Sequence, residues 1–491
     1  MSASPNTASI DPNIFRAYDI RGIFGQTLSE ACAEKIGQAI ASEARDRHVS
    51  TLAVGYDGRL SGPALNAALI RGITAAGVNV VSIGMVPTPG LYFATVLLGT
   101  GSGIMITGSH NPTDYNGFKI MLGGETLADD AIQQLHRRIV SDDLHSDPVP
   151  GNVRQQNVQP DYIARIAEQR TLDTQKTPLK VVIDCGNGVA GPWVLALMKH
   201  LGCEVIPLFC DVDGHFPNHH PDPEHAVNLQ DLIRTVKSSG ADIGLAFDGD
   251  GDRLGVVDNH GNIRDTDELL CLFALEILRQ HPGSEVVHDV KCSLNLRRLI
   301  ENNGGTATMW RCGHSMIKGR MKQTGAAFGG EFTGHLFFAE DWYGFDDALY
   351  TAVRVLEMLI KAKNSQQDAA ALFSAPLAGY PACIATPMIH ISTSEERKFT
   401  IISELQKREF DNARISTIDG LRAEFSDGWF GIRASNTSPN LTLRAEADTA
   451  DALQRIYTTI YSHLKQLAPE LQVPEEWLKT GTTQETDHAF N

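Results

Sequence analysis

The sequence predicts an α/β protein of several domains, with sheets that are largely parallel or mixed. Its 491 residues allow about three to four domains, since one domain usually takes roughly 100–200 residues. Short apolar runs alternate with segments of helical periodicity, which is typical of βαβ units. Hydrophobic residues make up 42% of the chain and charged residues 21%, so a sizeable core is expected.

The alternation can be followed in order along the chain. A helix is predicted over residues 29–46, a strand over 51–56, a second helix over 63–76 and a strand over 79–84. The run GSGIMITGS, residues 101–109, begins as an apolar strand and then turns polar. Further strands are predicted for LKVVIDC, CEVIPLF, ADIGLAFD and RLGVVD, residues 179–185, 203–209, 241–248 and 253–258.

Polar and turn-forming stretches divide the chain into domains. Residues 142–160 are expected to form a linker, residues 259–262 a turn, and residues 361–376 a further break before the last folded segment. The last residues, TGTTQETDHAFN, are expected to form a frayed tail. The predicted domains span residues 1–155, 156–258, 259–370 and 371–470, with a tail over 471–491.

Charge and cysteine content exclude several classes of protein. Fifty-nine acidic against 42 basic residues give a net charge of −17, which argues against a general nucleic-acid binder. Eight cysteines without C-x-x-C or zinc-type spacing predict free thiols in a reducing compartment. No signal peptide and no membrane-length apolar run is visible. We therefore expect a soluble, cytoplasmic protein, a monomer without nucleic-acid or membrane partners.

A polar loop, TGSHNP at residues 107–112, follows an apolar run in the first part of the chain. Function is expected there, because the carboxyl ends of strands carry the binding residues of α/β proteins. The hydroxyl of Ser109, next to His110 and upstream of Lys119, is a candidate phosphoryl carrier or nucleophile. Alternatively, a serine or asparagine before Pro112 caps the start of a helix.

A second loop, DGDGDR at residues 248–253, joins two apolar strands. It places Asp248, Asp250 and Asp252 at alternate positions with glycines between them. Such a loop can wrap a hard cation with carboxylate oxygens and leave Mg²⁺ positions open for a phosphate oxygen and for waters. The alternative is a solvated acidic turn.

Two more loops carry polar groups in short, glycine- or serine-rich segments. GEFTGH, residues 330–335, has hydrogen-bonding groups that suit sugar hydroxyls, in Glu331, Thr333 and His335. RASNTSPN, residues 433–440, has groups that suit a phosphate, in Arg433, Ser435, Asn436 and Thr437. Taken singly, each is more typical of an ordinary turn.

GNGVAG, residues 186–191, offers a competing interpretation. It fits G-x-G-x-x-G after a predicted strand, and Asp211 follows twenty residues past Gly191, as in dinucleotide-binding proteins. A nucleotide-dependent dehydrogenase is therefore an alternative class. However, this motif explains neither the TGSHNP loop nor the DGDGDR loop.

In this order and spacing, the four loops resemble those of the α-D-phosphohexomutase superfamily. FRAYDIRG (15–22), DVKC (289–292) and RCGHSMIKGR (311–320) extend the resemblance over about residues 13–465, near the bacterial phosphomannomutase/phosphoglucomutase group. One departure is GEFTGH, where bacterial members of this group usually have GEMSGH. The resemblance implies three related mixed-sheet α/β domains and a smaller, mobile C-terminal α+β domain around a central active-site cleft.

The resemblance also implies roles for individual residues. Ser109 would carry the phosphoryl group and hold Mg²⁺ together with Asp248, Asp250 and Asp252. The GEFTGH loop would contact the sugar, and the RASNTSPN loop would hold the phosphate that does not react. Further active-site positions are Tyr18, Arg21, His110, Lys119, Arg253, Lys291 and His314. General acid and base roles stay open among His314, Lys119, His110 and Arg21.

The implied activity is a Mg²⁺-dependent interconversion of hexose 1-phosphate and hexose 6-phosphate, of mannose or glucose. It would use a phosphoserine enzyme and a hexose 1,6-bisphosphate that serves as intermediate and activator. A phosphoglucosamine mutase and a non-catalytic sugar-phosphate-binding relative are the alternatives. The expected partners are phosphosugars, which requires basic residues to gather in one place despite the net charge of −17.

Overall fold

The computed structural model describes residues 10–170, 172–435 and 439–478. It separates into two compact units. Unit 1 comprises the chain up to residue 264 together with residues 334–372, and unit 2 comprises residues 265–333 and the chain from residue 373 onward. The end of the predicted tail, from residue 479, lies outside the described residues.

The first sheet of unit 1 has seven strands in the order β1-β5-β4-β2-β3-β7, with β6 paired to β5. The strands β2, β3, β4 and β7 are parallel, and β5 runs antiparallel to both β4 and β1. The strands are Ile20–Ile23 (β1), Thr51–Tyr56 (β2), Asn79–Met85 (β3), Gly103–Ile106 (β4), Tyr115–Leu122 (β5), Glu125–Thr126 (β6) and Val153–Gln155 (β7). The parallel strands β2 and β4 end at one edge, where the residues after each of them lie together.

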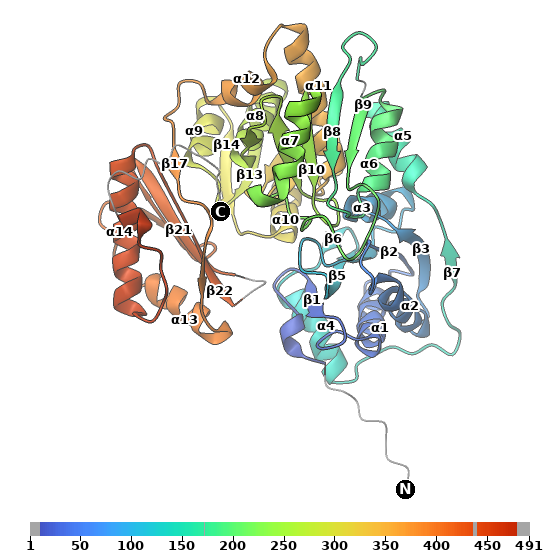
Figure 1. Ribbon diagram of the computed structural model, residues 1–491. Helices are drawn as coiled ribbons and strands as arrows, with labels where there is room; N and C mark the ends of the chain where they lie inside the picture. The colour runs from blue at the N-terminus through green and yellow to red at the C-terminus, as the bar shows by residue number, and fades with distance from the viewer. Residues whose placement is uncertain (1–9, 171, 436–438, 479–491) are drawn as a thin grey trace. The chain divides into compact units, whose positions relative to one another are not determined.

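Helices cover both faces of this sheet. Ser29 caps the first of them, where its hydroxyl accepts the backbone N–H of Cys32. Alternate residues such as Leu52 and Val54 share a core with α1, α2 and α4, whereas Ala53 faces the side of α3. The helices are Glu30–Asp46 (α1), Gly62–Ala75 (α2), Thr88–Leu97 (α3) and Asp130–Val140 (α4). Figure 1 shows α1 and α2 side by side.

The second sheet of unit 1 has five strands in the order β12-β11-β10-β8-β9. The strands β10, β8 and β9 are parallel, and β11 returns antiparallel to β10 as a hairpin. The strands are Lys180–Asp184 (β8), Glu204–Leu208 (β9), Ile243–Phe247 (β10), Leu254–Asp258 (β11) and Ile263–Arg264 (β12). Other elements within residues 12–264 and 334–374 are Pro12–Ile14 (η1), Gln159–Gln169 (α5), Gly191–His200 (α6), Ala226–Leu229 (η2), Gln230–Ser239 (α7), Leu336–Phe338 (β16), Ala348–Asn364 (α11) and Ala369–Ser374 (α12).

Unit 2 contains a parallel arrangement and an antiparallel one. In the first, β13 lies between β14 and β15 and is parallel to both. Its elements are Thr266–Gln280 (α8), Glu285–Asp289 (β13), Leu294–Asn302 (α9), Thr306–Trp310 (β14), His314–Thr324 (α10) and Phe328–Gly330 (β15).

The antiparallel sheet of unit 2 has six strands, with β22 paired to β17, β18 and β21. Helix α14 packs on β21 and β22 around a core that includes Ile432, Leu443 and Ile456 (Figure 1). The elements are Ala375–Leu377 (η3), Ile384–Ala385 (β17), Ile389–Ser392 (β18), Glu395–Leu405 (α13), Arg414–Ser416 (β19), Leu421–Phe425 (β20), Gly428–Ala434 (β21), Asn440–Ala447 (β22), Ala450–Leu467 (α14) and Glu476–Leu478 (η4).

The predicted α/β class with mixed sheets is confirmed, and the predicted strands and helices match their observed counterparts closely. One difference lies in the expected linker 142–160, which contains β7, paired in parallel with β3. All eight cysteines are free, as their spacing predicts. Within the described parts of the chain, no helix has the length and apolar character needed to cross a membrane. The residue bounds of the four domains stay predictions.

Candidate active site

The loop after β4 presents Ser109 in an unusual backbone conformation. Ser109 is 4% exposed and has a φ of 48°, in the left-handed region. This conformation costs a residue with a side chain about 1–2 kcal/mol, so surrounding contacts must hold it. No helix begins in this loop, which turns directly into β5. The alternative that the loop caps a helix is therefore wrong.

The DGDGDR loop closes the hairpin between β10 and β11. Asp248, Asp250 and Asp252 are fully buried, and an oxygen from each lies within 4.8 Å of the others. Asp248 Oδ1 accepts the backbone N–H groups of Gly251 at 3.0 Å, Asp252 at 3.0 Å and Arg253 at 3.1 Å. The loop is therefore not a solvated acidic turn but a buried carboxylate cluster.

The two loops meet at Ser109. Its hydroxyl donates to Oδ2 of Asp248 at 3.1 Å and lies 3.2 Å from Nδ1 of His110. Burial lowers the pKa of His110 to about 3, helped by the positive charge of Arg253, so the ring is neutral at pH 7. The predicted nucleophile and the predicted cation ligands thus lie side by side in unit 1.

Lys119 enters the same cluster from β5. Its ammonium contacts Asp250 at 2.8 Å and also contacts Asp252. Burial acts to lower the pKa of Lys119, but the two carboxylates outweigh it and hold that pKa well above its usual value. Burial and the charges of Asp252 and Asp250 raise the pKa of Asp248 well above its usual value. The cluster therefore carries more negative charge than one lysine balances.

The donor set of the cluster fits a Mg²⁺ ion. Oδ2 of Asp250 accepts hydrogen bonds from Thr88 at 2.6 Å, Thr107 at 3.1 Å and Lys119 at 2.8 Å. The other oxygen, Oδ1, is buried and bonds to no described residue. Hard carboxylate oxygens with a free, buried ligand atom are what Mg²⁺ prefers. A second group that shares Asp252 also places ligand atoms within 4.8 Å of one another, with His335 and Asp346.

The remaining predicted residues of unit 1 surround this cluster. Arg21, on β1, donates to the carbonyl oxygen of Thr107 at 2.7 Å and interacts electrostatically with the half-buried Tyr18. Arg253 Nε lies 3.3 Å from His335 Nε2, which lies 3.1 Å from Asp252 Oδ1. Arg253 and His335 therefore extend the buried polar network beyond the three aspartates.

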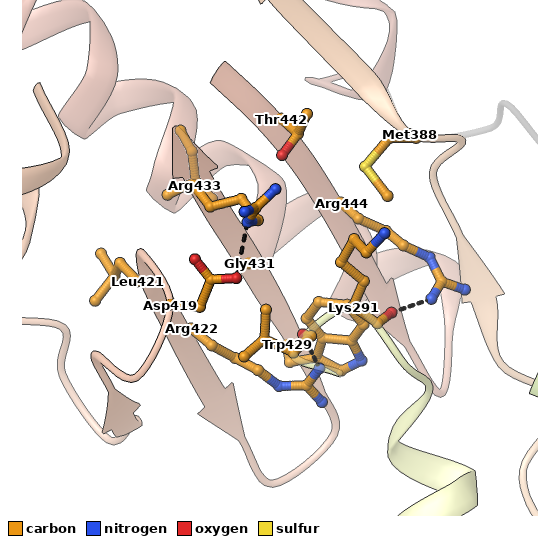
Figure 2. A pocket seen from close by; sticks show the side chains of 12 residues that line it. Lys291, Met388, Asp419, Leu421, Arg422, Trp429, Gly431, Arg433, Thr442 and Arg444 are labelled. Atoms are coloured by element: carbon orange, nitrogen blue, oxygen red, sulfur yellow. Dashed lines mark hydrogen bonds and ion pairs between the residues drawn. The ribbon is translucent and has the colours of Figure 1, made fainter. Parts of the chain in front are cut away.

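Unit 2 assembles a second polar group around a pocket. Asp419 Oδ2 accepts both Nε of Arg433 and the backbone N–H of Cys312, each at 2.9 Å. Figure 2 shows Asp419 reaching toward Arg433 in this pocket. Other basic residues that line it are Lys291, Arg422 and Arg444. The pocket therefore has the charge that an anionic group requires.

Other predicted residues of unit 2 are ordered by backbone contacts. Glu331 accepts the N–H of Gly313 at 2.6 Å, at the start of the helix α10 that begins with buried His314. Ser435 is buried, and its carbonyl oxygen accepts Lys398 at 2.7 Å. Thr333 is half-buried, and Asn436 and Thr437 lie outside the described residues.

Comparison with known proteins identifies the family. Four models match in order: phosphoglucomutase/phosphomannomutase alpha/beta/alpha domains I, II and III and the C-terminal domain, at residues 12–145, 160–261, 265–375 and 388–462. The chain belongs to this enzyme family, within the α-D-phosphohexomutase superfamily. The family resemblance stated from the sequence motifs is thereby confirmed.

Individual relatives support this assignment. A phosphomannomutase/phosphoglucomutase of Pseudomonas putida is 50% identical over 468 residues, 95% of this chain and 98% of the relative. A phosphoglucomutase of Neisseria meningitidis is 50% identical over 452 residues, 91% of this chain and 96% of the relative. A crystal structure of a Burkholderia thailandensis family protein, 45% identical, aligns over 95% of this chain and 100% of that chain with a TM-score of 0.87.

Family membership also accounts for GNGVAG without a dinucleotide. The loop lies between β8 and α6, where it bonds to and packs against neighbouring segments. The N–H of Val189 donates to the carbonyl oxygen of Gly249 in the acidic loop at 3.2 Å, and Asn187 Nδ2 donates to the carbonyl oxygen of Asp211 at 2.9 Å. A side chain at Gly191 would collide with the backbone of Cys210. These glycines allow close packing inside a family member.

The departure at Phe332 has a structural counterpart in unit 2. The guanidinium carbon of Arg444 lies 3.9 Å from the centroid of the Phe332 ring and 5.6 Å from that of Trp429. The guanidinium of Arg422 covers Trp429 at 3.7 Å. Arg444 also bonds to the carbonyl oxygen of Lys291 (Figure 2). The GEFTGH and DVKC segments are thereby both attached to the antiparallel sheet.

Several residues of the site were absent from the sequence predictions. Thr88 and Thr107 bond to Asp250, Asp419 orders Arg433, and Asp57 and Arg59 contact the backbone of the serine loop. One signal was available for the last two. Asp57 and Arg59 come directly after strand 51–56, just as the DGDGDR loop begins at the last residue of strand 241–248, and the carboxyl ends of strands are where α/β proteins place functional residues.

Proposed function

We propose that the chain is a Mg²⁺-dependent phosphohexomutase that interconverts hexose 1-phosphates and hexose 6-phosphates of mannose or glucose through phosphorylated Ser109. The observation that carries the proposal is the 3.1 Å contact between Ser109 Oγ and Asp248 Oδ2 in a buried carboxylate cluster. A hydroxyl beside candidate cation ligands is the arrangement that phosphoryl transfer needs, since this chemistry depends on positioning and charge stabilisation.

In this proposal, the cation ligands are Asp248, Asp250, Asp252 and the phosphorylated Ser109. When bound, Mg²⁺ supplies positive charge that stabilises the negative charge developing on the transferred phosphoryl group. A phosphoserine adds a charge of about −1.5 to −2 to three buried carboxylates. Arg21, Lys119 and Arg253 supply positive side chains in the same unit and would bind phosphoryl oxygens as they approach Ser109.

The proposed reaction consists of two phosphoryl transfers. In the first, the bond between Ser109 Oγ and phosphorus breaks, and the free C1 or C6 hydroxyl of a hexose monophosphate gains the phosphoryl group. The hydroxyl loses its proton to a base, and the product is a hexose 1,6-bisphosphate. Ser109 Oγ is protonated as it leaves in this first transfer. After the bisphosphate reorients, the bond between its other phosphorus and the sugar oxygen breaks, the phosphoryl group returns to Ser109 Oγ, Oγ gives its proton to the base, and the sugar oxygen takes up a proton from the acid.

The general acid and base are proposed from Lys119, His110, Arg21 and His314. His110 is suited to accept a proton near Ser109, because its ring is neutral and its Nδ1 lies 3.2 Å from the serine oxygen. Lys119 is charged and is therefore suited to donate a proton or to stabilise a negative oxygen. Varying each in turn and comparing pH–rate profiles distinguishes these roles.

The substrate-binding residues are proposed from the family resemblance. The non-reacting phosphate would bind at Arg433 and Ser435, with Asn436 and Thr437 proposed from the sequence resemblance. The sugar hydroxyls would contact Glu331, Thr333 and His335. Tyr18 and Lys291 complete the proposed set. A single fixed phosphate position serves both orientations of the bisphosphate, because C1 and C6 phosphates present similar oxygen atoms to an arginine fork.

The proposal is tested with Ser109→Ala and with mass spectrometry of the purified protein. We expect phosphate on the peptide that contains Ser109, and loss of conversion of mannose 1-phosphate to mannose 6-phosphate in the variant. Ser141→Ala is a control, because Ser141 follows α4 and is exposed. Full turnover by the Ser109→Ala variant would exclude the phosphoserine mechanism.

The substrate is identified by a panel of mannose, glucose and glucosamine 1-phosphates. We expect mannose and glucose 1-phosphates to react with similar kcat/KM and glucosamine 1-phosphate to react more slowly. A preference for the amino sugar would assign the chain a phosphoglucosamine mutase activity instead. Binding of all three without turnover would indicate a non-catalytic relative.

A further inference from the structure

Arg59 lies beneath the serine loop and contacts its backbone along most of its length. It follows β2 in the segment YDGR and is 1% exposed. Its two terminal nitrogens donate to backbone carbonyl oxygens of the loop and of the first residue of β5. The acceptors are Ser109 at 2.7 Å, Asn111 at 2.5 Å, Tyr115 at 2.9 Å and Pro112.

Asp57 completes this arrangement from the same turn. Its Oδ2 lies 3.3 Å from Nε of Arg59 and accepts the backbone N–H of Gly108 at 3.1 Å. The residue before Ser109 is thus held by a carboxylate, and Ser109 with the residues after it is held by the guanidinium. The pair neutralises its own charge within the interior.

The loop has no room to move away from Arg59. A Cβ atom at Gly108 would lie 2.2 Å from Nε of Arg59, and one at Gly249 would lie 2.4 Å from the carbonyl oxygen of Ser109. The serine backbone is therefore enclosed between the guanidinium on one side and the acidic loop on the other. Phe216 covers the guanidinium, with its ring centroid 5.3 Å from the guanidinium carbon.

An arginine is the side chain that this geometry requires. A guanidinium holds its donors in a rigid plane and can serve several carbonyl oxygens at once, whereas a lysine ammonium is a single point on a flexible stem. The left-handed φ of Ser109 is unfavourable for a residue with a side chain, so it must be imposed from outside. Arg59 bonds to the carbonyl oxygen of Ser109 at 2.7 Å, and Thr107 Oγ1 accepts the backbone N–H of Ser109 at 2.7 Å, so both backbone groups of Ser109 are restrained.

We propose that Arg59 is a positioning residue that holds Ser109 in its left-handed conformation, and thereby aims the serine oxygen at the carboxylate cluster. This inference rests on the proposed function of Ser109 as the phosphoryl carrier. Arg59 acts through the backbone of the loop and not on the reacting atoms themselves. A misplacement of the carrier oxygen impairs transfer, but it leaves the phosphate and sugar contacts of unit 2 intact.

The test compares Arg59→Lys with Arg354→Lys as a matched control. Arg354 is also fully buried in unit 1, where it bonds to Glu340 at 3.0 Å and lies over the ring of Phe338. For Arg59→Lys we expect kcat to fall by about a hundredfold, with KM within about twofold of the wild-type value. Arg354→Lys should retain the wild-type kcat even if it lowers the melting temperature as much as Arg59→Lys does.

A phosphorus NMR spectrum gives a second readout that stability alone does not move. In Arg59→Lys, the resonance of phosphorylated Ser109 should shift toward the position of phosphoserine in an unfolded peptide. In Arg354→Lys it should stay at the wild-type position. A folded Arg59→Lys enzyme with unchanged kcat, or with an increased KM and unchanged kcat, would overturn the inference.

A second variant keeps the inference testable if Arg59→Lys does not fold. The double variant Asp57→Asn/Arg59→Gln removes both buried charges together, so it leaves no unpaired charge in the interior. It also removes most of the donors to the loop, and we expect the same loss of kcat; a wild-type kcat would overturn the inference.

The inference and the proposed function on which it rests fail in different ways. If wild-type protein carries no phosphate on Ser109, or if Ser109→Ala keeps full turnover, the proposed function fails and the inference fails with it. If wild-type Ser109 is phosphorylated and the Arg59 variants transfer that phosphate at the wild-type rate, only the inference about Arg59 fails.

Discussion

The hydroxyl oxygen of Ser109 lies 3.1 Å from Oδ2 of Asp248, although 139 residues separate them in the chain. Ser109 follows β4 of the first sheet, and Asp248 follows β10 of the second. Both loops leave the carboxyl ends of parallel strands, so two sheets of unit 1 present their functional edges to each other. The Ser109–Asp248 contact joins the proposed carrier to the proposed cation site.

We predict that Asp250→Asn weakens the binding of Mg²⁺ at the proposed cation site. The substitution replaces one oxygen of the buried carboxylate, whose Oδ1 bonds to no described residue, by an NH2 group and removes its negative charge. The Mg²⁺ concentration for half-maximal activity should therefore rise by at least about tenfold. Titration of activity with Mg²⁺ measures this change. Asp258→Asn is the control, because Asp258 is equally buried but bonds to Asn262 and Arg264. An unchanged Mg²⁺ dependence in Asp250→Asn would contradict the assignment.

We predict that Asp419→Ala impairs substrate binding more than turnover. Asp419 holds Nε of Arg433 at 2.9 Å, and Arg433 is proposed to bind the phosphate that does not react. Loss of this charge-assisted contact should raise KM for hexose 1-phosphates about tenfold and change kcat by less than about twofold. Steady-state kinetics check this. Asp427→Ala, which removes an exposed pair with Arg455, should leave both constants unchanged. A tenfold fall in kcat would instead indicate that Arg433 acts on the phosphate that is transferred.

We predict that Phe332→Met destabilises unit 2. The substitution removes the ring that covers Arg444 at 3.9 Å, and a partly desolvated cation–π contact contributes about 1 kcal/mol. The free energy of unfolding, measured by urea denaturation, should fall by about that amount. Phe425→Met provides a comparison, because its partner Arg455 is half exposed, and it should cost less. Equal losses in the two variants would show that the Phe332–Arg444 stack stabilises the protein no more than the Phe425–Arg455 contact does.

We predict a pH-dependent stability term from His288 on β13. Burial lowers the pKa of His288 to about 4, below its ordinary value of 6.5, so the unfolded chain binds more protons between these values. The resulting stability is present above pH 6.5 and is lost as pH falls toward 4; at pH 5 the loss is about 2 kcal/mol.

Unfolding free energies at pH 7 and pH 5 check this prediction. His288→Gln should lose about 2 kcal/mol less than the wild type between these pH values. The exposed His200, at the end of α6, provides the control His200→Gln, which should behave as the wild type does. If His288→Gln and the wild type lose equal stability, the buried ring does not titrate as proposed.

Local sequence patterns predicted most elements because those elements are decided by neighbouring residues. The strand predicted over 51–56 is β2, and the helix predicted over 29–46 is α1 with Ser29 as its cap. Strand β7 was not predicted, since three exposed residues between polar stretches carry no apolar signal. Its formation depends on the free edge of β3.

The residues of the candidate site likewise fall into those that the sequence predicted and those that it did not. Ser109 and the three aspartates stand out in the sequence because hydroxyl and carboxylate groups gather directly after apolar strands. Arg59 and Asp57 share only the position after an apolar strand, and a single arginine there is indistinguishable from a surface residue until the loop that covers it is known. Asp419 likewise becomes visible only through its contact with Arg433.

The sequence by itself determined the α/β class, the four chemically distinctive loops and the resemblance to a family, because each depends on residue type and spacing along the chain. Tertiary structure decided which groups meet. It placed Ser109 against Asp248, buried Lys119 among carboxylates, and covered Arg444 with Phe332. These relationships depend on the packing of segments far apart in the chain, and no local pattern encodes a contact of that kind.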